Sequence, residues 1–248
     1  MDIPNRYKKI FRQLKSRQGR KKSDYYICEG LRSCQEAFKW ISADIELVIS
    51  NQSLDLNQFE GFEQPYFCLN DQDFSTLSHT ENPQGIILLI KKKEVKIDSL
   101  NGQTIIAFDR LSDPGNVGTI LRTALAAGIR SAVWVKGGCD PFSAKAIRSG
   151  MGAQFAMTIY QIDSIEDLKK YWPDKCIWLS EINGGKSCYD SEYSLKNSIL
   201  VMGNEANGVM KIDQSQSVTI PMPGPTESLN VAQAATILIF EALRRSEI

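Results

Sequence analysis

Polar side chains that could bind a ligand gather in three short stretches of this 248-residue chain. The stretches span residues 109–124, 200–209 and 220–235, and each begins where an apolar, strand-like segment ends. They supply amides, hydroxyls, carboxylates such as Glu205 and guanidinium groups such as Arg122. Such groups donate and accept hydrogen bonds or carry charge. Three clusters of them at strand ends therefore indicate recognition of a polar ligand.

The third stretch combines a stiff loop with the start of a helix. Three prolines and a glycine fall within residues 221–225, which excludes a helix or a central strand there. A helix is predicted from Leu229 to about Arg245, with Ser228 as its N-cap. Helix N-termini carry free N–H groups, so Ser228 and Asn230 at such an end suit a polar ligand. A Pro-rich turn with an ordinary cap remains the alternative.

The first stretch leaves a strand through a Pro-Gly turn and enters a helix. Asn116 is predicted near the N-terminus of that helix. Arg122 lies six residues further on, so its side chain faces a ligand only if the helix borders a cleft. Alternatively, Asn116 is a helix cap and Arg122 forms a surface ion pair.

The second stretch places Glu205 just behind a predicted buried strand, next to Gly203 and Asn204. Glutamate and asparagine are uncommon in strand cores, which favours a functional role. A glycine there permits close approach of the backbone to a ligand. None of the three stretches contains G-x-G-x-x-G or G-x-x-x-x-G-K-S/T, so a Rossmann dinucleotide site or a P-loop is not indicated.

The composition is that of a soluble globular protein, with 42% hydrophobic and 23% charged residues. The sequence has no apolar run of membrane-spanning length and no signal-like apolar segment near its start, so we expect a cytoplasmic protein without membrane contacts. The six cysteines are scattered and are expected to be reduced thiols. Because His79 is the only histidine, a zinc site or a Ser-His-Asp triad is poorly supported, and no metal is expected.

The charge is unevenly distributed although the net charge is zero. Residues 1–24 contain nine lysines and arginines but only two aspartates, so this segment carries a charge of +7. A basic arm on a neutral protein suggests contact with a phosphate backbone. A solvated, frayed terminus is the alternative.

The hydrophobic pattern predicts an α/β protein of two parts. A basic amphipathic helix is expected over 5–22, and residues 1–24 form a basic arm. Residues 25–96 alternate strands and helices and form a small α/β domain. A turn at 101–102 marks the boundary to a larger domain, residues 102–248.

The larger domain is predicted to contain a mostly parallel sheet between helices, because its strands are short, unbroken apolar runs. Ligands of such sheets bind beyond the carboxyl ends of the strands, where the polar stretches lie. Strands are expected at 105–108, 132–135, 157–160, 177–179, 199–202 and 218–220, and helices at 117–127, 141–149, 165–171 and 229–245.

The three stretches, in this order and spacing, resemble the signature motifs of the SpoU/TrmH family of RNA ribose 2′-O-methyltransferases, in the SPOUT superfamily. The resemblance covers residues 102–248. Residues 25–90 also resemble the family's N-terminal RNA-binding domain, with 29–32 and 80–85 in their usual places.

The resemblance implies a parallel sheet with a deep trefoil knot, a homodimer, and S-adenosylmethionine bound largely through backbone groups. It implies that Arg122 is nearest to the role of base, that Asn116 orients the substrate, and that Glu205, Ser228 and Asn230 complete the catalytic site. The implied cofactor neighbours are Leu179, Ser180, Glu181, Gly203, Asn204, Ile220, Met222, Ser228 and Leu229.

The implied substrate is structured RNA, with ribosomal RNA favoured over transfer RNA because the N-terminal domain resembles that of rRNA-modifying members. Tyr7, Phe11, Tyr25 and Tyr26 could stack on unpaired bases or could belong to the core. A non-catalytic RNA-binding or ribosome-assembly protein of the same fold is an alternative. A methyltransferase acting on a tRNA base is a third possibility.

Overall fold

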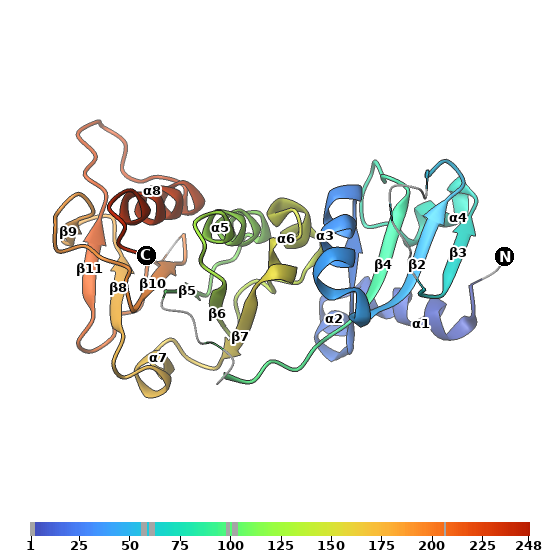
Figure 1. Cartoon of the computed structure of the whole chain (residues 1–248), viewed down its shortest axis with the longest axis horizontal. Coiled ribbons are helices and arrows are strands. Elements are labelled where there is room, and N and C mark those ends of the chain that lie inside the picture. The colour runs from blue at the N-terminus through green and yellow to red at the C-terminus, as the bar shows by residue number, and fades with distance from the viewer. Residues whose placement is uncertain (1–2, 56–58, 60–62, 98–99, 101–103, 206) are drawn as a thin grey trace.

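The computed structural model describes residues 3–55, 59, 63–97, 100, 104–205 and 207–248. The predicted turn at 101–102 lies outside the described residues. Figure 1 shows two sheets side by side, joined by a chain segment that runs along one edge of the molecule. Among the described residues, every helix is too short or too polar to span a bilayer. All six cysteines are free thiols, three of them buried.

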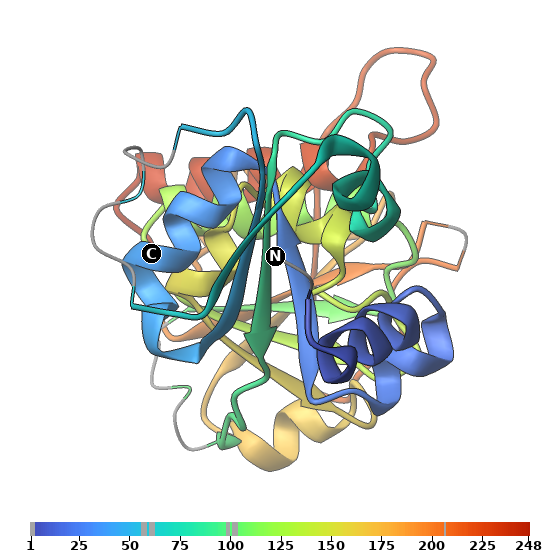
Figure 2. The same ribbon diagram turned by 90° about the vertical axis from the view of Figure 1, so that its right-hand side faces the viewer.

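The N-terminal sheet has four strands in the order β1-β4-β2-β3, with β4 antiparallel to both of its neighbours. Apolar residues cover both of its faces, because α3 packs on one side and α1 and α4 on the other. Figure 2 shows the strands between these two helical layers. The elements are β1 (Tyr25–Glu29), α3 (Leu31–Ile41), β2 (Ile45–Asn51), β3 (Tyr66–Leu69), α4 (Asp71–Leu77) and β4 (Ile86–Lys91), with a short 3-10 turn, η1 (Ser42–Asp44).

The predicted single basic helix over 5–22 is wrong, because the segment forms two helices, α1 (Asn5–Leu14) and α2 (Arg17–Lys22). Ser16 has an extended backbone, and its side chain accepts a hydrogen bond from the N–H of Gly19, which starts the second helix. Tyr7 and Phe11 are buried under the sheet. These two aromatic side chains are therefore core residues, and they are not available for stacking on bases.

The C-terminal sheet has seven strands, all parallel, in the order β7-β6-β5-β10-β8-β11-β9. This confirms the predicted parallel α/β architecture. Helices α5, α6 and α8 lie along one face, and α7 lies at the other (Figure 1). The elements are β5 (Ile105–Asp109), α5 (Pro114–Ala126), β6 (Ser131–Val135), α6 (Ala144–Gly150), η4 (Ala153–Ala156), β7 (Thr158–Ile162), α7 (Asp167–Tyr171), β8 (Cys176–Ser180), β9 (Lys186–Ser187), β10 (Ser198–Gly203), β11 (Gln216–Thr219) and α8 (Val231–Arg244).

Several predicted boundaries are wrong because local caps determine where helices begin. Helix α5 begins three residues before the predicted Val117, since Asp113 accepts a hydrogen bond from the N–H of Asn116 at 3.0 Å. Helix α6 begins at Ala144 rather than at 141, behind the cap Ser143. Strand β9 has only two residues, too few to produce an alternating pattern.

The two sheets are held together by an aromatic contact. The Tyr26 ring in β1 lies 5.3 Å from the Phe142 ring and 6.4 Å from the Phe155 ring, centre to centre. Phe155 and Ile147 belong to the same buried cluster as the residues under α3. The N-terminal module therefore packs directly on the larger domain through apolar side chains.

Candidate active site

The first two polar stretches meet because their strands are neighbours. Strands β5 and β10 pair in parallel, with Asp109 opposite Gly203 at their carboxyl ends. The loops that follow therefore leave the sheet at the same edge, as expected for a parallel sheet. Asn204 donates a hydrogen bond from Nδ2 to the carbonyl of Arg110 at 2.9 Å, which ties the two loops together.

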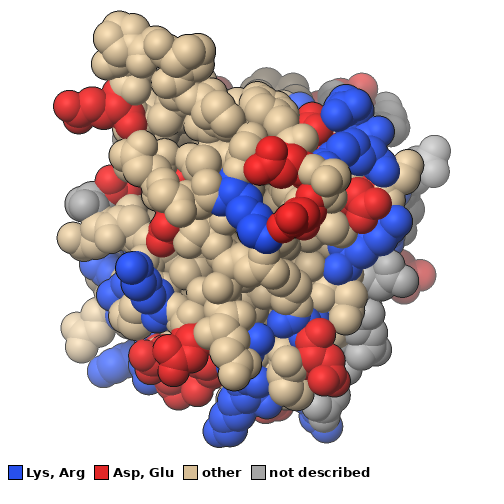
Figure 3. Space-filling view, turned by 90° about the vertical axis from the view of Figure 1, so that its left-hand side faces the viewer, with Lys and Arg blue, Asp and Glu red and all other residues tan. Residues whose placement is uncertain are grey.

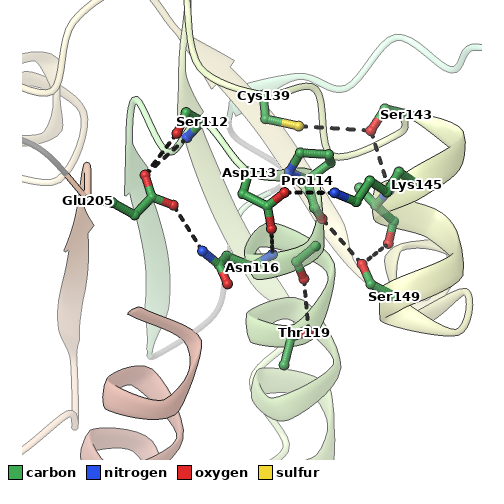
Figure 4. Close-up of polar contacts among 12 residues, drawn as sticks. Ser112, Asp113, Pro114, Asn116, Thr119, Cys139, Ser143, Lys145, Ser149 and Glu205 are labelled. Atoms are coloured by element: carbon green, nitrogen blue, oxygen red, sulfur yellow. Dashed lines mark hydrogen bonds and ion pairs between the residues drawn. The ribbon is translucent and has the colours of Figure 1, made fainter. Parts of the chain in front are cut away.

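One side chain from each of the three stretches enters a single hydrogen-bonded cluster. Asn116 Nδ2 donates to Glu205 Oε1 at 2.9 Å, and Asn230 Nδ2 donates to Asn116 Oδ1 at 3.1 Å. Ser112 Oγ donates to the second carboxylate oxygen of Glu205 at 3.0 Å. Figure 4 shows Glu205 between Ser112 and Asn116. The structure thus brings together Asn116, Glu205 and Asn230, three residues that the resemblance placed in one site.

These hydrogen bonds also set the charge of the cluster. Partial burial acts to raise the pKa of Glu205, but the hydrogen bonds from Asn116 and Ser112 outweigh it, and the net pKa is lowered. Glu205 is therefore an ionised acceptor at neutral pH that holds Asn116 and Ser112 in fixed positions.

The prediction that Ser228 caps the last helix is wrong. Asn230 is the N-cap of α8, since its Oδ1 accepts hydrogen bonds from the N–H groups of Ala232 at 2.9 Å and Gln233 at 3.4 Å. Its extended backbone and short amide meet the requirements of a cap two residues later than predicted. The alternative in which Asn116 is itself a cap is excluded, because Asp113 caps α5 and the side chain of Asn116 points to Glu205 and Asn230.

Asp109 and Arg110 form a polar pair at the active-site edge of the sheet that was not singled out from the sequence. The carboxylate of Asp109 is fully buried and accepts two hydrogen bonds from Arg110, at 2.7 and 3.1 Å, and one from the N–H of Met210 at 2.8 Å. Arg110 adopts a left-handed backbone conformation with a φ of 53°, which is uncommon for a residue other than glycine. The signal available in the sequence was an Asp-Arg pair at the end of a buried strand.

A cavity of about 380 Å³ opens beside this cluster. Eight of the nine predicted cofactor neighbours line it, whereas Leu179 is buried beneath it in the sheet. The lining residues that were predicted are Ser180, Glu181, Gly203, Asn204, Ile220, Met222, Ser228 and Leu229. Glu205 and Asn230 also line the cavity, and Met202, Val231 and Leu238 add an apolar wall.

The cavity suits a small ligand with both apolar and polar parts, such as S-adenosylmethionine. Within the described part of the chain, the main-chain groups of Met222, Ser228 and Leu229 make no main-chain hydrogen bonds, so they remain available to a ligand. A Cβ added to Gly203 would lie 2.5 Å from the carbonyl carbon of Gly208, so only glycine allows these two segments to approach. The residues present therefore fit such a cofactor.

Arg122 does not join the cluster within one chain. It lies on α5, is exposed to solvent, and lines none of the cavities described here. Its neighbour Thr123 reaches Thr236 of α8, with 3.4 Å between the hydroxyl oxygens, so the two helices that begin at the cluster run side by side. Its predicted role stays a prediction.

With this site and fold, the chain belongs to the SpoU rRNA methylase family, whose model matches residues 103–240. A second model, described as an MRM3-like substrate binding domain, matches residues 5–88. The resemblance inferred from the three stretches is thereby confirmed.

Relatives of similar length carry the same assignment. The chain is 30% identical to the 23S rRNA (guanosine(2553)-2′-O)-methyltransferase RlmP of Bacillus subtilis, covering 95% of both chains. It superposes on a TrmH-family putative RNA methyltransferase from Porphyromonas gingivalis with a TM-score of 0.83, 26% identity and coverage of 99% and 100%. It also superposes on an AdoMet-bound rRNA methyltransferase from Sinorhizobium meliloti, with a TM-score of 0.81, 26% identity and coverage of 99% and 97%.

Proposed function

We propose that this protein transfers a methyl group from S-adenosylmethionine to a ribose 2′-hydroxyl of ribosomal RNA. The observation that carries the proposal is the meeting of Asn116, Glu205 and Asn230 at the mouth of the cavity. Relatives named as rRNA 2′-O-methyltransferases support the reaction and the substrate class. A solved relative in its AdoMet-bound form supports the cofactor.

The chemistry consists of forming a bond between O2′ and a methyl carbon while the bond from that carbon to sulfur breaks. When bound, S-adenosylmethionine supplies an activated methyl group on a sulfonium, so the protein's task is alignment and proton removal. Alignment of the reacting atoms is worth on the order of 7–11 kcal/mol, and a base contributes roughly a further 100- to 10,000-fold.

Asn116 is placed to align the ribose. Its Oδ1 accepts from Asn230 and one Nδ2 hydrogen goes to Glu205, which leaves one amide hydrogen for the substrate. Glu205 is ionised and fixes the amide of Asn116 by accepting its other Nδ2 hydrogen. The cluster therefore presents a fixed donor next to the cavity that would contain the methyl group.

Arg122 is proposed to bind the phosphate next to the target ribose and to stabilise the negative charge that develops on O2′. An arginine is effectively always protonated, so the proton leaves to phosphate, to solvent or to a transiently deprotonated guanidine. Because Arg122 is exposed and apart from its own chain's cluster, we propose that it serves the site of a second copy.

A homodimer would supply that second copy. Two apolar residues on the last turns of α8, Phe240 and Leu243, are 42% and 38% exposed. Figure 3 views the end of the molecule formed by the C-terminal part of the sheet, where uncharged residues cover much of the surface between groups of charged side chains. Exposed large apolar side chains such as these are typical of a protein interface. The trefoil knot, the cytoplasmic location and the absence of a catalytic metal remain part of the proposal.

Mapping of 2′-O-methyl sites in total RNA, with and without the gene for this protein, tests the proposed function directly. We expect one ribosomal RNA position to lose its methyl group and to regain it with purified protein and cofactor. A lost site in transfer RNA would instead indicate a tRNA ribose methyltransferase. No lost site, together with no cofactor binding, would favour the non-catalytic alternative.

Subunit mixing tests the role of Arg122. Arg122→Ala and Asn116→Ala chains are each expected to be inactive alone, because each lacks one half of every site. Mixed dimers would contain one site with both residues intact if Arg122 acts across the interface, and activity should return to at most about half of the wild-type level. No recovery on mixing would contradict this arrangement, and substantial turnover by Arg122→Lys would contradict the need for the guanidinium fork.

A further inference from the structure

A second, larger cleft lies between the N-terminal module and the sheet edge that carries the active site. Its volume is about 850 Å³. Its walls come from α2, from the segment after β4, from the loops after β5 and β6, and from α6. Asn204 lines both this cleft and the cofactor cavity, and Ser112 of the active-site cluster lines the cleft as well. The cleft is therefore continuous with the active site.

The cleft is strongly basic. Among the residues that the structure describes, eight lysines and arginines line it, against a single acidic residue, Asp140. The basic residues are Arg17, Arg20, Lys21, Lys92, Arg110, Lys136, Lys145 and Arg148. A concave surface with one sign of charge concentrates ligands of the opposite sign, and eight cations match a run of phosphates.

These eight side chains differ in what they already bind. Arg110, Lys136 and Lys145 each pair with an aspartate, namely Asp109, Asp163 and Asp113. Within the described residues, Arg17, Lys21 and Arg148 have no hydrogen bond or ion pair from the side chain. Arg20 and Lys92 donate only to backbone carbonyls. Five of the cations are thus without a carboxylate partner and can neutralise phosphates.

Buried polar atoms at the cleft also lack partners. Arg148 Nη1 and His79 Nε2 are both buried, and neither has a hydrogen-bond partner among the described residues. Buried polar nitrogens without partners are rare in native proteins because leaving them unpaired is costly. Both residues line the cleft, so a bound ligand could supply the missing partners, and an anionic oxygen would suit the Arg148 guanidinium in particular.

An aromatic wall accompanies the charge. Trp134 lines the cleft and also an adjoining cavity of about 370 Å³ that contains Tyr26, Phe142 and Phe155. Unpaired RNA bases stack on exposed aromatic rings, while their phosphates contact lysine and arginine. Tyr26 of the N-terminal module packs on Phe142 of the larger domain. This contact fixes the distance between the two parts, so the cleft between them exists before any ligand binds.

We propose that this cleft binds the single-stranded RNA segment on one side of the methylated nucleotide, with phosphates on Arg17, Lys21 and Arg148 and a base on Trp134. The inference rests on the proposed function and adds a defined substrate path to it. The basic N-terminal segment then acts through only some of its charges, namely those of α2 that face the cleft.

A matched pair of triple variants tests the cleft. Arg17→Gln/Lys21→Gln/Arg148→Gln removes three cleft cations, and Lys9→Gln/Arg12→Gln/Lys22→Gln removes three exposed cations that do not line the cleft. Substitutions are a better test than a deletion of residues 1–22, because a deletion would also remove Tyr7 and Phe11 from the core. The probe is a ribosomal RNA fragment with an unpaired loop, titrated at several salt concentrations, with thermal unfolding and cofactor titration as checks on folding.

The cleft variant should bind the RNA roughly 10- to 100-fold more weakly at 0.1 M salt, and its log K against log[salt] slope should be shallower by about 2. The control variant should stay within about threefold of wild type. Equal losses in both variants, or none in the cleft variant, would overturn the proposal.

Trp134→Leu adds a test that does not depend on charge. It should weaken binding of the unpaired loop by roughly 10-fold and leave the affinity for a fully paired RNA unchanged, because only unpaired bases can stack. Equal effects on both RNAs would overturn the assignment of Trp134. If the wild-type protein binds the RNA through the cleft but methylates no ribose, the proposed function fails while the cleft stands.

Discussion

The cofactor cavity and the basic cleft share Asn204 but are built in different ways. The cavity is small, has an apolar wall, and is formed mainly by short loops that follow β8, β10 and β11. The cleft is more than twice as large and collects cations from α2, from the segment after β4, from the loops after β5 and β6, and from α6. A small ligand needs a pocket of defined shape, and short contiguous motifs can form one from their backbone. An RNA strand needs positive side chains near its phosphates, and these can come from distant parts of the chain.

The largest effect is expected from Asn116→Ala, which removes the amide that joins the three stretches. Loss of one positioned donor at a reacting centre typically costs 100- to 1,000-fold in turnover, so methylation should fall by about that factor. Cofactor affinity should change by less than about threefold, because Asn116 does not line the cofactor cavity. Single-turnover methylation and a cofactor titration measure the two quantities.

Thr119→Ala is the matched control for Asn116. Thr119 lies one turn further along α5, is exposed, and donates only to the carbonyl of Gly115 at 2.8 Å (Figure 4). Its removal should leave turnover within about twofold of wild type. Equal losses of methylation and cofactor affinity in Asn116→Ala would mean that the residue has a structural role instead.

The second largest expected effect is a difference in salt dependence between RNA binding in the cleft and cofactor binding in the cavity. If five cleft cations neutralise phosphates of a single strand, the slope of log K against log[salt] is about −3.5, so a threefold rise in salt should weaken RNA binding about 50-fold. Cofactor binding should change by less than about twofold, because nearly all the residues that line the cavity are uncharged. Similar salt dependences of the two affinities would remove the distinction between the regions.

The features of the cavity side that could be predicted from the sequence are local ones. Proline and glycine restrict the loop at 221–225, and polar residues directly behind apolar strands identify the functional edge of the sheet. The parallel sheet followed from this pattern, whereas the predicted cofactor neighbours, eight of which line the cavity, came from the resemblance to the SpoU/TrmH motifs. The predicted N-cap of α8, Ser228, was wrong, and Asn230 is the cap. Serine and asparagine are both good N-caps, so the residue type alone does not show which of them has the backbone conformation of a cap.

The cleft could not be predicted from the sequence. Arg148 and Lys21 are 127 positions apart, and no local pattern indicates that their side chains line one surface. The excess of charge in residues 1–24 was visible, but not which of the nine cations face the active site. That depends on the break at Ser16, which separates α1 on the sheet from α2 at the cleft.

A moderate effect is expected from Gly203→Ala. The added Cβ would lie 2.5 Å from Gly208 and 2.6 Å from the backbone nitrogen of Val209, so the loop after β10 would have to move. Overpacking of this kind costs about 1–3 kcal/mol, and a loss of 1.4 kcal/mol in binding is tenfold. Cofactor affinity should therefore fall about 10-fold, while RNA binding in the cleft is retained. Isothermal titration measures both.

Gly224→Ala is the control for the glycine variant. A Cβ on Gly224 meets no atom within 4 Å, although it lies in the loop between β11 and α8. This variant should bind the cofactor like the wild type. A tenfold loss in Gly224→Ala would show that the loop responds to any substitution, and that the close approach at Gly203 has no special role.

The smallest effect is expected from the ionisation of Glu205. Its pKa is lowered below the ordinary value of 4.5 in the folded protein, since hydrogen bonds from Asn116 and Ser112 outweigh the opposing effect of partial burial. The unfolded chain therefore binds the proton more tightly, and the stabilisation is complete above pH 4.5 and declines as the pH falls through the folded pKa. Glu205→Gln lacks this contribution, so the difference in Tm between wild type and variant should stay constant from pH 7 to about 5 and shrink as the pH falls below 4.5. Glu227→Gln, in the exposed loop before α8, should show no such trend.

A Tm difference for Glu205→Gln that is constant over this range would mean that the three stretches are held together by shape and not by the charge of Glu205.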